Sequence, residues 1–580
     1  MGRKRKKTTP PIHALESGVI RKSWHGRTRI CLVYPNRYRV GMSNLGFHAV
    51  YRLLNDLDDI VCERAFLRKD RSSPTVSIES GRPLGNFDLI AFSVSFENDY
   101  IHILDILDSA GLPLQAERRG PPHPLILAGG VACFLNPEPL APFVDGILIG
   151  EAEPLLERLV SSYRRLDFGH ASTRMQNLAA LAREVPGFYA PACYRPSYHA
   201  DGTLADFVPV GNAPAAVERQ FLPDLGECST CSAILTEDTA FERSFLIEVS
   251  RGCPHGCRFC SAGFVYRPPR FRQLSQLAAS LRQGAALSDR VGLVGAAVSD
   301  LPAIETLCTA SLETGVRLSF SSLRADALSV GMIAALRCSR VKTATIAPEA
   351  GSQRLRDVIN KGINEADVLR AASALVAGGI PNLRLYFMVG LPTETEADIA
   401  ALVDICREVA QRFVDASRPH GRIGQLTVGI SPFVPKASTP FQWAPMSDTP
   451  ALKRKIAAIK QGLRQTPNLK VHADPPGQSY IQALLARGDR RAAELLQAAH
   501  RNRGNWAKTL KAASFDPDFF ALRERSLDER LPWDFIDSGV RKSFLKAEYR
   551  QALAGRPSPP CPVTDCARCG LCRNVPPADR

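Results

Sequence analysis

The sequence lacks any long hydrophobic run. No apolar stretch approaches the roughly 18 residues that a membrane helix needs, and the longest, Pro124–Leu135, is interrupted by small residues. The basic start is not followed by the apolar stretch of a secretory signal, and Lys6 stands where a myristoylation signal has Ser or Thr. These absences argue against a membrane protein, and we expect a cytoplasmic protein with no membrane partner.

The composition also lacks the polar bias of a disordered chain. Of the 580 residues, 45% are hydrophobic and 23% are charged, and such a length suggests several globular domains. Much of the net charge of +15 lies in residues 1–30, where nine Lys and Arg face only Glu16. Such an arm could bind an anionic partner, with RNA as the leading candidate. A solvated tail that only aids solubility explains the same charge run, and we favour that explanation.

The sixteen cysteines do not have the pattern of a disulfide framework. Seven are single residues in apolar contexts, as is typical of buried reduced thiols. In a reducing compartment, grouped thiols indicate a metal-binding site and not disulfides. An isolated C-x2-C pair is more often two ordinary thiols. The grouped residues are Cys228 and Cys231; Cys253, Cys257 and Cys260; and Cys561, Cys566, Cys569 and Cys572.

Short apolar runs alternate with helical patterns from about residue 29 to 165, which predicts a parallel sheet with helical crossovers. We expect strands at 29–34, 89–96, 125–128 and 145–149, and a helix at 44–57. Ligands of such sheets bind at the carboxyl ends of the strands. Gly129 and Gly130 follow one predicted strand and would let a ligand approach the backbone closely. A Rossmann-like scaffold without a ligand is the alternative.

A second alternating region begins at Phe245 and contains six strand–helix units, which predicts an open or partial parallel barrel. Beyond residue 475 the pattern is helical and ends in a proline-rich segment before the last cysteine group. The predicted barrel strands are Phe245–Val249, Val291–Val298, Val316–Ser321, Lys342–Ala347, Leu383–Val389 and Gln425–Ile430.

Cys253, Cys257 and Cys260 directly follow the first barrel strand. A closed zinc site would need a fourth ligand, and no cysteine lies between Cys260 and Cys308. Three thiolates on a [4Fe–4S] cluster leave one iron free to bind a substrate or cofactor. Phe259, between the last two cysteines of the group, can shield such a cluster from water.

This C-x3-C-x2-C loop, with an aromatic residue before its third cysteine, resembles the radical S-adenosylmethionine (radical SAM) superfamily. The resemblance implies that Cys253, Cys257 and Cys260 bind three irons, while the fourth iron chelates S-adenosylmethionine. Electron transfer from the cluster would then give methionine and a 5′-deoxyadenosyl radical. It also implies an electron-donating reductase, a flavodoxin or ferredoxin.

The resemblance continues along the barrel. Pro348–Ser352, followed by RLRDVINKG, looks like the E-x-G-S…N-K-G stretch of the subgroup that includes methylthiotransferases and cobalamin-dependent members. The loops that begin at Gly390 and at Ser431 match as well. By position, the resemblance implies that Glu349, Ser352 and Gly390 contact S-adenosylmethionine, although Gly390 is equally interpreted as a turn residue. After the second strand, Ser299 and Asp300 replace the usual Gly-Gly-Glu.

The N-terminal sheet resembles the cobalamin-binding domain that precedes the barrel in many of these enzymes, and Gly129 and Gly130 are its implied cofactor contacts. The D-x-H-x-x-G loop that places a histidine on cobalt is absent, and His48 falls inside the following predicted helix. Cobalamin bound here would therefore lack that ligand. A scaffold or substrate domain remains the alternative.

Cys561, Cys566, Cys569 and Cys572 supply four thiolates near the end of the sequence. Four such ligands complete either an auxiliary iron–sulfur cluster, which the two-residue spacings slightly favour, or a structural zinc site. Either metal would stabilise a short tail with little core of its own.

We therefore predict an α/β protein with a Rossmann-like, cobalamin-binding-type sheet, a partial (β/α)6 radical SAM barrel and a helical C-terminal region with a four-cysteine tail. The predicted function is radical SAM chemistry, as cobalamin-dependent methylation or rearrangement of an unidentified substrate. The alternatives are a cobalamin-free, methylthiotransferase-like modifier of tRNA or ribosomal protein, and a non-enzymatic iron–sulfur or zinc protein that binds nucleic acid. The expected segments are a basic tail (1–28), the sheet domain (29–190), a connector (191–240), the barrel (241–474), a helical domain (475–555) and the metal-binding tail (556–580).

Overall fold

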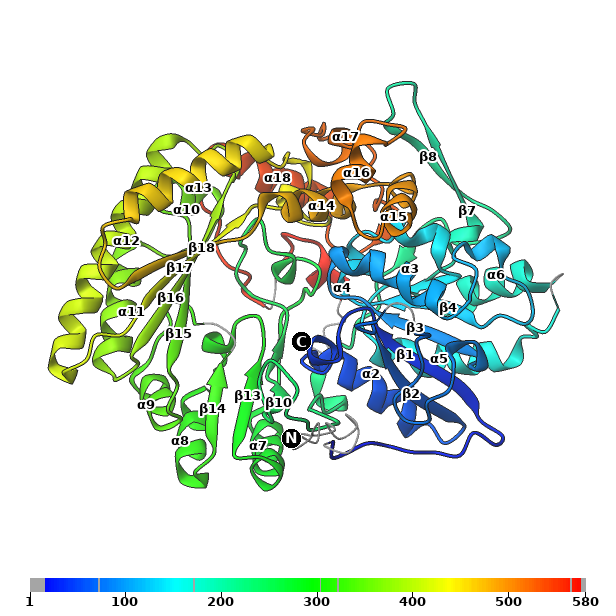
Figure 1. The fold of residues 1–580 in the computed structure, drawn as a ribbon, viewed down its shortest axis with the longest axis horizontal. Helices are drawn as coiled ribbons and strands as arrows, with labels where there is room; N and C mark the ends of the chain where they lie inside the picture. Colours follow the sequence, from blue (N-terminus) through cyan, green and yellow to red (C-terminus); the bar gives the residue numbers. More distant parts are fainter. Residues whose placement is uncertain are drawn as a thin grey trace, which may run out of the picture.

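The computed structural model describes residues 16–70, 73–170, 173–302, 304–320, 323–563 and 566–574. Two α/β units lie side by side, the N-terminal one in blue to cyan and the second in green to yellow, and helices near the C-terminus lie across both (Figure 1). Half of the basic segment, residues 1–15, falls outside the described residues, and so does that part of the proposed RNA-binding arm. In the described ranges, no helix combines the length and the apolar character needed to cross a membrane.

The N-terminal unit is a six-stranded sheet in the order β2-β1-β3-β4-β5-β6, parallel except at β6. The interior strand β1 buries its last five residues, because helices cover both faces of such a sheet. The strands are β1 (Thr28–Tyr34), β2 (Ile60–Phe66), β3 (Leu89–Ser93), β4 (Leu125–Gly129), β5 (Gly146–Leu148) and β6 (Phe188–Tyr189). The helices are α1 (Tyr38–Gly41), α2 (Leu45–Asp56), α3 (Tyr100–Ser109), α4 (Val131–Leu135), α5 (Glu153–Arg165) and α6 (Arg174–Glu184).

Strand β2 escaped the sequence-based prediction because charged residues interrupt its hydrophobic run. Arg64 is buried in this strand, and its guanidinium lies 2.8 Å from Glu16 and 2.6 Å from Glu79. Two carboxylates compensate the buried charge, so the segment can occupy a fully buried strand despite its polar residues.

The predicted connector contains an antiparallel hairpin of β7 (Tyr194–Tyr198) and β8 (Leu204–Pro209). A further short strand, β9 (Val217–Glu218), pairs with β19 (Ile536–Asp537) from the C-terminal region. The connector is thereby anchored to a segment more than half the chain away in sequence.

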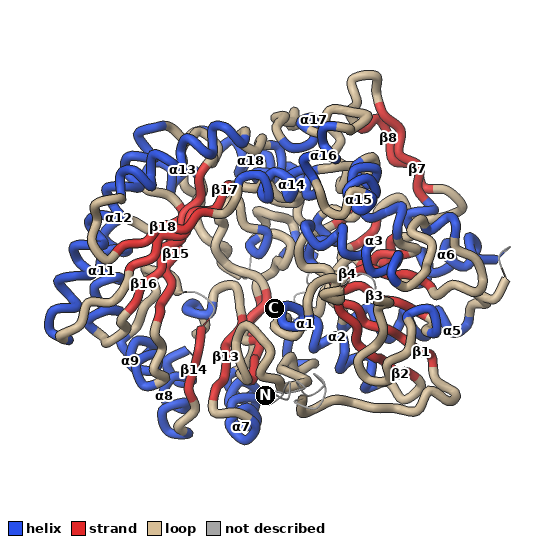
Figure 2. Tube along the Cα trace, viewed as in Figure 1, coloured by secondary structure: helices blue, strands red, loops and turns tan. Residues whose placement is uncertain are grey.

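The second unit is an open barrel of two parallel sheets, β10-β13-β14 and β15-β16-β17-β18, joined by a bridge between Leu323 and Ile346. Its helices lie on the outer side of the strands (Figure 2). The strands are β10 (Phe245–Glu248), β13 (Arg290–Val294), β14 (Arg317–Phe320), β15 (Thr343–Glu349), β16 (Asn382–Val389), β17 (Leu426–Pro432) and β18 (Leu469–Ala473). The helices are α7 (Leu274–Leu287), α8 (Ile304–Thr314), α9 (Val330–Cys338), α10 (Gln353–Val358), α11 (Glu365–Ala377), α12 (Glu396–Ser417) and α13 (Thr449–Leu463).

All six predicted barrel strands are present, and β18 adds a seventh that the sequence analysis missed. Residues of β18 alternate between half-buried and exposed at the edge of the sheet. An edge strand with no fully buried residue gives only a weak hydrophobic signal.

The C-terminal region contains α14 (Pro476–Arg487), α15 (Ala492–Arg501), α16 (Trp506–Lys511), α17 (Asp518–Ala521) and α18 (Lys542–Leu553). Two of its basic residues act inside the protein: the guanidinium of Arg487 is buried and donates to the Ala521 and Arg523 carbonyls, and Arg490 pairs with Glu138 of the N-terminal unit. These two arginines therefore stabilise the packing of the C-terminal region, on itself and on the N-terminal unit.

Candidate active site

The cysteine triplet lies in the loop that follows the first barrel strand. The strand β11 (Ser250–Arg251) pairs with β12 (Arg270–Phe271) and closes the loop at its base. Gly252, at a φ of +84°, makes the sharp turn before Cys253, and a Cβ on it would lie 2.5 Å from the Tyr266 carbonyl oxygen. This close approach of two backbone segments requires glycine.

The three thiols share one environment inside the barrel. Burial, and after it the neighbouring thiols, raises the pKa of Cys253 to about 12 and that of Cys260 to about 11. Cys257 is buried, which raises its pKa, while the cations of Lys361 and Arg324 oppose the shift.

The donor chemistry of this loop fits an iron–sulfur cluster. Within the described part of the chain, no three His, Cys, Asp or Glu side chains converge as ligands of a single metal ion. The thiolates of a [4Fe–4S] cube bind separate iron atoms, so its ligands need not meet at one point. Phe259, between the last two cysteines, is half-buried and packs against the hydrophobic core.

A half-buried ion pair lies near Cys257 of the triplet. Lys361 Nζ lies 3.2 Å from Glu349 Oε1, at the end of β15. Burial raises the pKa of Glu349, and the Lys361 ammonium partly offsets this; burial also disfavours the Lys361 charge, but Glu349 and Cys257 outweigh it and raise the lysine pKa. Glu349 has a φ of +67°, a backbone conformation that costs free energy for a residue with a side chain. The sequence analysis proposed Glu349 and quoted the N-K-G stretch, but it did not single out Lys361.

A histidine of the cysteine loop pairs with an aspartate that follows the next barrel strand. His255, between the first two cysteines, lies with its Nε2 2.7 Å from Asp300 Oδ2. Asp300 follows β13, where the sequence departs from the Gly-Gly-Glu of the resembled family. The sequence analysis identified the departure but not the histidine partner, which is distant in sequence.

Ser352 and Gly390 have structural roles in this arrangement. The Ser352 hydroxyl accepts the Leu355 amide at the start of α10 and donates to Asp398 of α12. Gly390, at a φ of +82°, ends β16, and its amide donates to Glu394 Oε1 at 2.9 Å. The contacts of Gly390 are therefore those of a turn residue.

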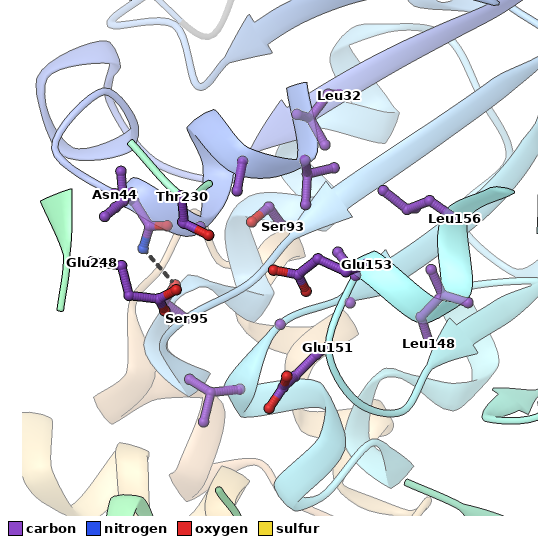
Figure 3. A pocket seen from close by; sticks show the side chains of 18 of the residues that line it. Leu32, Asn44, Ser93, Ser95, Leu148, Glu151, Glu153, Leu156, Thr230 and Glu248 are labelled. Carbon is purple, nitrogen blue, oxygen red and sulfur yellow. Dashed lines mark hydrogen bonds between the residues drawn. The ribbon is translucent and has the colours of Figure 1, made fainter. Parts of the chain in front are cut away.

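A cavity of about 690 Å³ lies between the two units. Its walls come from the N-terminal sheet, from α2 and α5, and from the barrel strands β10, β13 and β14. Figure 3 shows Leu32, Leu148 and Leu156 at one end and polar side chains at the other. The polar end includes Asn44, whose amide donates to Ser95 Oγ at 3.0 Å.

Gly129 and Gly130 both line this cavity, where the predicted sheet ends. Gly130 has a φ of +102°, and a Cβ on it would lie 2.4 Å from the Val94 carbonyl oxygen. The two glycines bring backbone, without side chains, to the cavity wall.

A buried ionic cluster joins the units beside the cavity. Arg251 Nη1 lies 2.6 Å from Glu151, and its Nη2 lies 2.8 Å from Glu153 and 2.9 Å from Glu248. Arg270 adds a second pair with Glu151 at 2.7 Å. Burial would raise the pKa of Glu151 and of Glu248, but the arginines outweigh it and lower both. Arg251 stands two residues before Cys253, so the cluster fixes the N-terminal unit next to the cysteine loop.

His48 lies within α2, as the sequence analysis expected, and takes no part in lining the cavity. Its ring nitrogens contact the Met42 carbonyl and the Ile234 amide. Burial lowers its pKa to about 4, so the ring is neutral near neutral pH. The described residues that line the cavity include no histidine.

The C-terminal cysteines lie next to the cysteine loop of the barrel, since Cys561 and Cys566 line a small cavity together with Gly256. Cys569 is buried, and Cys561, Cys566 and Cys572 are half-buried. Burial raises the pKa of Cys572, and the other three thiols of the group add to the shift. The four thiols are close enough to interact, although in the described residues they do not converge on the position of a single metal ion.

Two families match this chain. The family described as "Radical SAM proteins, N-terminal" matches residues 46–191, and the "Radical SAM superfamily" matches residues 247–406. The second match includes Cys253, Cys257 and Cys260, together with Glu349 and Lys361.

Among curated relatives, "Uncharacterized protein MJ0966" of Methanocaldococcus jannaschii is 29% identical over 518 residues, which cover 89% of this chain and 98% of that protein. A tRNA-2-methylthio-N(6)-dimethylallyladenosine synthase of Chloroherpeton thalassium is 28% identical over 197 residues, 30% of this chain and 43% of that protein.

Among solved structures, the radical S-adenosylmethionine methyltransferase TsrM of Kitasatospora setae, with cobalamin and a [4Fe–4S] cluster bound, gives a TM-score of 0.47 at 12% identity, over 84% of this chain and all (100%) of that one. The cobalamin-dependent radical enzyme OxsB gives a TM-score of 0.43 at 16% identity over 65% of this chain, which spans about half (52%) of OxsB. Because both family matches fall on the two α/β units, and the second includes the cysteine loop, this chain belongs to the radical SAM superfamily and is a radical SAM enzyme.

Proposed function

We propose that this enzyme cleaves S-adenosylmethionine at a [4Fe–4S] cluster held by Cys253, Cys257 and Cys260, and that it transfers a methyl group or rearranges its substrate with the help of a corrinoid. The cavity is the observation that supports a bound corrinoid, because it is lined both by Gly129 and Gly130 of the N-terminal unit and by the first barrel strands. A cofactor held there would lie close to the cysteine loop, because Arg251, two residues before Cys253, lines the cavity.

A cluster bound by Cys253, Cys257 and Cys260 would supply the electron that cleaves the sulfonium bond of S-adenosylmethionine. The protein supplies position and exclusion of water. The carboxylate of Glu349 suits the amino group of the methionine part, and the Lys361 ammonium, 3.2 Å away, favours the charged form of that carboxylate against the effect of burial. Arg324 and Lys361 add positive charge beside Cys257, which favours an anionic cluster and the carboxylate of S-adenosylmethionine.

The apolar walls of the cavity suit the hydrophobic parts of a corrinoid, and the hydroxyl and amide groups of Ser93, Ser95 and Asn44 suit its amide side chains. His48 is held by two backbone contacts outside the cavity, so a corrinoid bound here would take no ligand from it.

Anaerobic reconstitution tests both parts. The protein is loaded with iron and sulfide, supplied with dithionite, S-adenosylmethionine and hydroxocobalamin, and assayed for 5′-deoxyadenosine and for corrin that survives gel filtration. We expect deoxyadenosine and retained corrin. Cys257→Ala should lose the cluster and all cleavage. Ala49→Trp, which fills the cavity, should lose corrin but keep cleavage, and the exposed α12 variant Ala400→Trp should keep both. A fully loaded wild-type cluster without retained corrin would refute the corrinoid part.

The alternative is a cobalamin-free modifier similar to the methylthiotransferases. The partial match to a tRNA-2-methylthio-N(6)-dimethylallyladenosine synthase favours it. The second cluster of such an enzyme would have to lie at the C-terminal cysteines, because the N-terminal domain has no cysteine triplet. In the same assay, this alternative predicts deoxyadenosine without retained corrin.

A further inference from the structure

The C-terminal cysteine segment is bonded directly to the loop that carries the triplet. The amide of Cys561 donates to the Pro254 carbonyl at 2.8 Å, and Pro254 adjoins Cys253. One hydrogen bond and the backbone of Pro254 therefore separate the two cysteine groups. This contact joins residues about three hundred positions apart in sequence and leaves little freedom between the two segments.

Arg258, between the second and third cysteines of the triplet, forms a second connection. Its guanidinium is fully buried, and Nη2 donates to the Arg556 carbonyl at 2.8 Å and to Ser558 Oγ at 3.0 Å. Nη1 donates to the carbonyls of Asp357 and Val358 after β15. The side chain thus holds the cysteine loop between the barrel and the C-terminal segment.

Glu548 of α18 extends this connection to the C-terminal cysteines. Its Oε2 lies 3.2 Å from Arg258 Nε and accepts the Ser558 hydroxyl at 2.8 Å. Its Oε1 lies 3.3 Å from Nη2 of Arg568, which stands between Cys566 and Cys569. One buried carboxylate therefore pairs with an arginine from each cysteine group.

Asn360 makes a third connection. Its Oδ1 accepts the Ser558 amide at 2.8 Å, and its Nδ2 donates to the Gly256 carbonyl at 3.1 Å, between the first two cysteines of the triplet. A side chain on Gly256 would crowd this amide, since a Cβ there would lie 3.0 Å from Asn360 Nδ2. The packing at this junction is tight.

We infer that Cys561, Cys566, Cys569 and Cys572 bind a thiophilic metal centre, and that metal binding there holds the catalytic cysteine loop in its binding geometry through Arg258, Glu548, Ser558 and Asn360. Four thiolates gathered in one neighbourhood repel one another, and a bound cation removes that repulsion. Because the segment has little core of its own, metal binding would order it, and the hydrogen bonds would transmit that order to the loop. The inference rests on the proposed cluster at Cys253, Cys257 and Cys260.

The first experiment asks whether the second centre exists and which metal it holds. Iron, sulfide and zinc are measured in the anaerobically reconstituted full chain and in a variant in which the three barrel cysteines are replaced by alanine. Metal that remains in this variant belongs to the C-terminal cysteines: iron with sulfide indicates a cluster, and zinc indicates a tetrahedral site. No bound metal in the variant would overturn the inference, whatever the wild-type enzyme does with S-adenosylmethionine.

The second experiment tests the coupling by hydrogen–deuterium exchange of the loop 252–263 and by the rate at which a chelator removes the barrel cluster. Cys569→Ser and Glu548→Gln should each speed both processes about tenfold, the loss expected when a buried network of charge-assisted hydrogen bonds is broken. Cys406→Ala, at a buried single cysteine in α12, is the matched control and should change neither rate. Unchanged exchange and chelator loss in Cys569→Ser would overturn the coupling. Absent deoxyadenosine with intact coupling would count against the proposed function alone.

Discussion

Replacement of Arg251 by methionine tests whether the buried ionic cluster fixes the N-terminal unit to the cysteine loop. The guanidinium lies within 3 Å of three carboxylates, at 2.6, 2.8 and 2.9 Å from Glu151, Glu153 and Glu248. Methionine keeps the length of the side chain and removes its charge and all of its donors. The variant therefore leaves these carboxylates buried with less compensation.

The expected loss in the free energy of unfolding depends on which of the three carboxylates keep another cation as a partner. Glu151 still pairs with Arg270 at 2.7 Å and Glu248 with Arg272 at 2.7 Å, whereas Arg251 is the cation that the described structure pairs with Glu153. Breaking a buried ion pair from one side costs roughly 3–5 kcal/mol. We expect about 3 kcal/mol, the lower end of that range, because only one of the three acids is stranded.

The loss should depend on pH in a defined direction. Burial opposes ionisation of Glu248, and Arg251 is the largest influence that lowers its pKa below the ordinary value. The wild-type stabilisation is therefore fully present above the ordinary glutamate pKa and is lost as the pH falls from there through the lowered pKa of the folded protein. Without Arg251 the pKa values of these acids rise. The difference between variant and wild type should therefore be largest near neutral pH and shrink in acid.

Urea-induced unfolding followed by circular dichroism, at neutral and at acidic pH, measures both effects. Arg165→Met is the control, because it removes an exposed ion pair with Glu184 and should cost at most about 1 kcal/mol. An Arg251→Met variant as stable as this control, or one whose deficit grows in acid, would refute the reasoning.

Three further variants test the site. Gly130→Ala should lower the free energy of unfolding by about 3 kcal/mol, because it adds both left-handed strain and a steric clash with a backbone carbonyl. The control Gly211→Ala, at a positive φ with open space around it, should lower it by about 1 kcal/mol. Equal losses of stability in thermal unfolding would contradict the clash. Burial lowers the pKa of His48 to about 4, so the wild type should lose roughly 3 kcal/mol of its free energy of unfolding as the pH falls from 6.5 to that value. In urea titrations at different pH, His48→Gln should lack this part of the loss of stability in acid. Lys361→Met should weaken S-adenosylmethionine binding about tenfold, because Glu349 loses its ammonium partner, and Lys361→Arg should restore the affinity. Anaerobic calorimetry measures both. Equal affinities in the wild type and the two variants would show that Glu349 and Lys361 do not belong to the binding site.

The alternation of strands and helices was readable from the sequence because each strand buries a run of apolar residues. The prediction failed where that signal was weak. Buried charges interrupt β2, and β18 lies at an edge with no fully buried residue. The cysteine triplet was readable from its spacing alone, because its three members share one loop.

The polar partners of that loop were harder to predict. Lys361 lies in a stretch that the sequence analysis quoted, but its pairing with Glu349 depends on how the segment after α10 folds back onto β15. Asp300 stood out as a departure from the resembled family, yet only the folded barrel brings it to His255. Ser352 and Gly390 were chosen by position, and their contacts in the protein are a helix cap and a turn.

The sequence by itself determined the thiol chemistry and the two α/β units, because cysteine spacing and hydrophobic periodicity are local properties of the chain. Only the tertiary structure decided where those units meet. The cavity takes its walls from both units, and the Arg251 cluster and the bond from Cys561 to Pro254 join segments about one hundred and three hundred residues apart. Such contacts depend on how the elements pack against one another, and local patterns do not encode that packing.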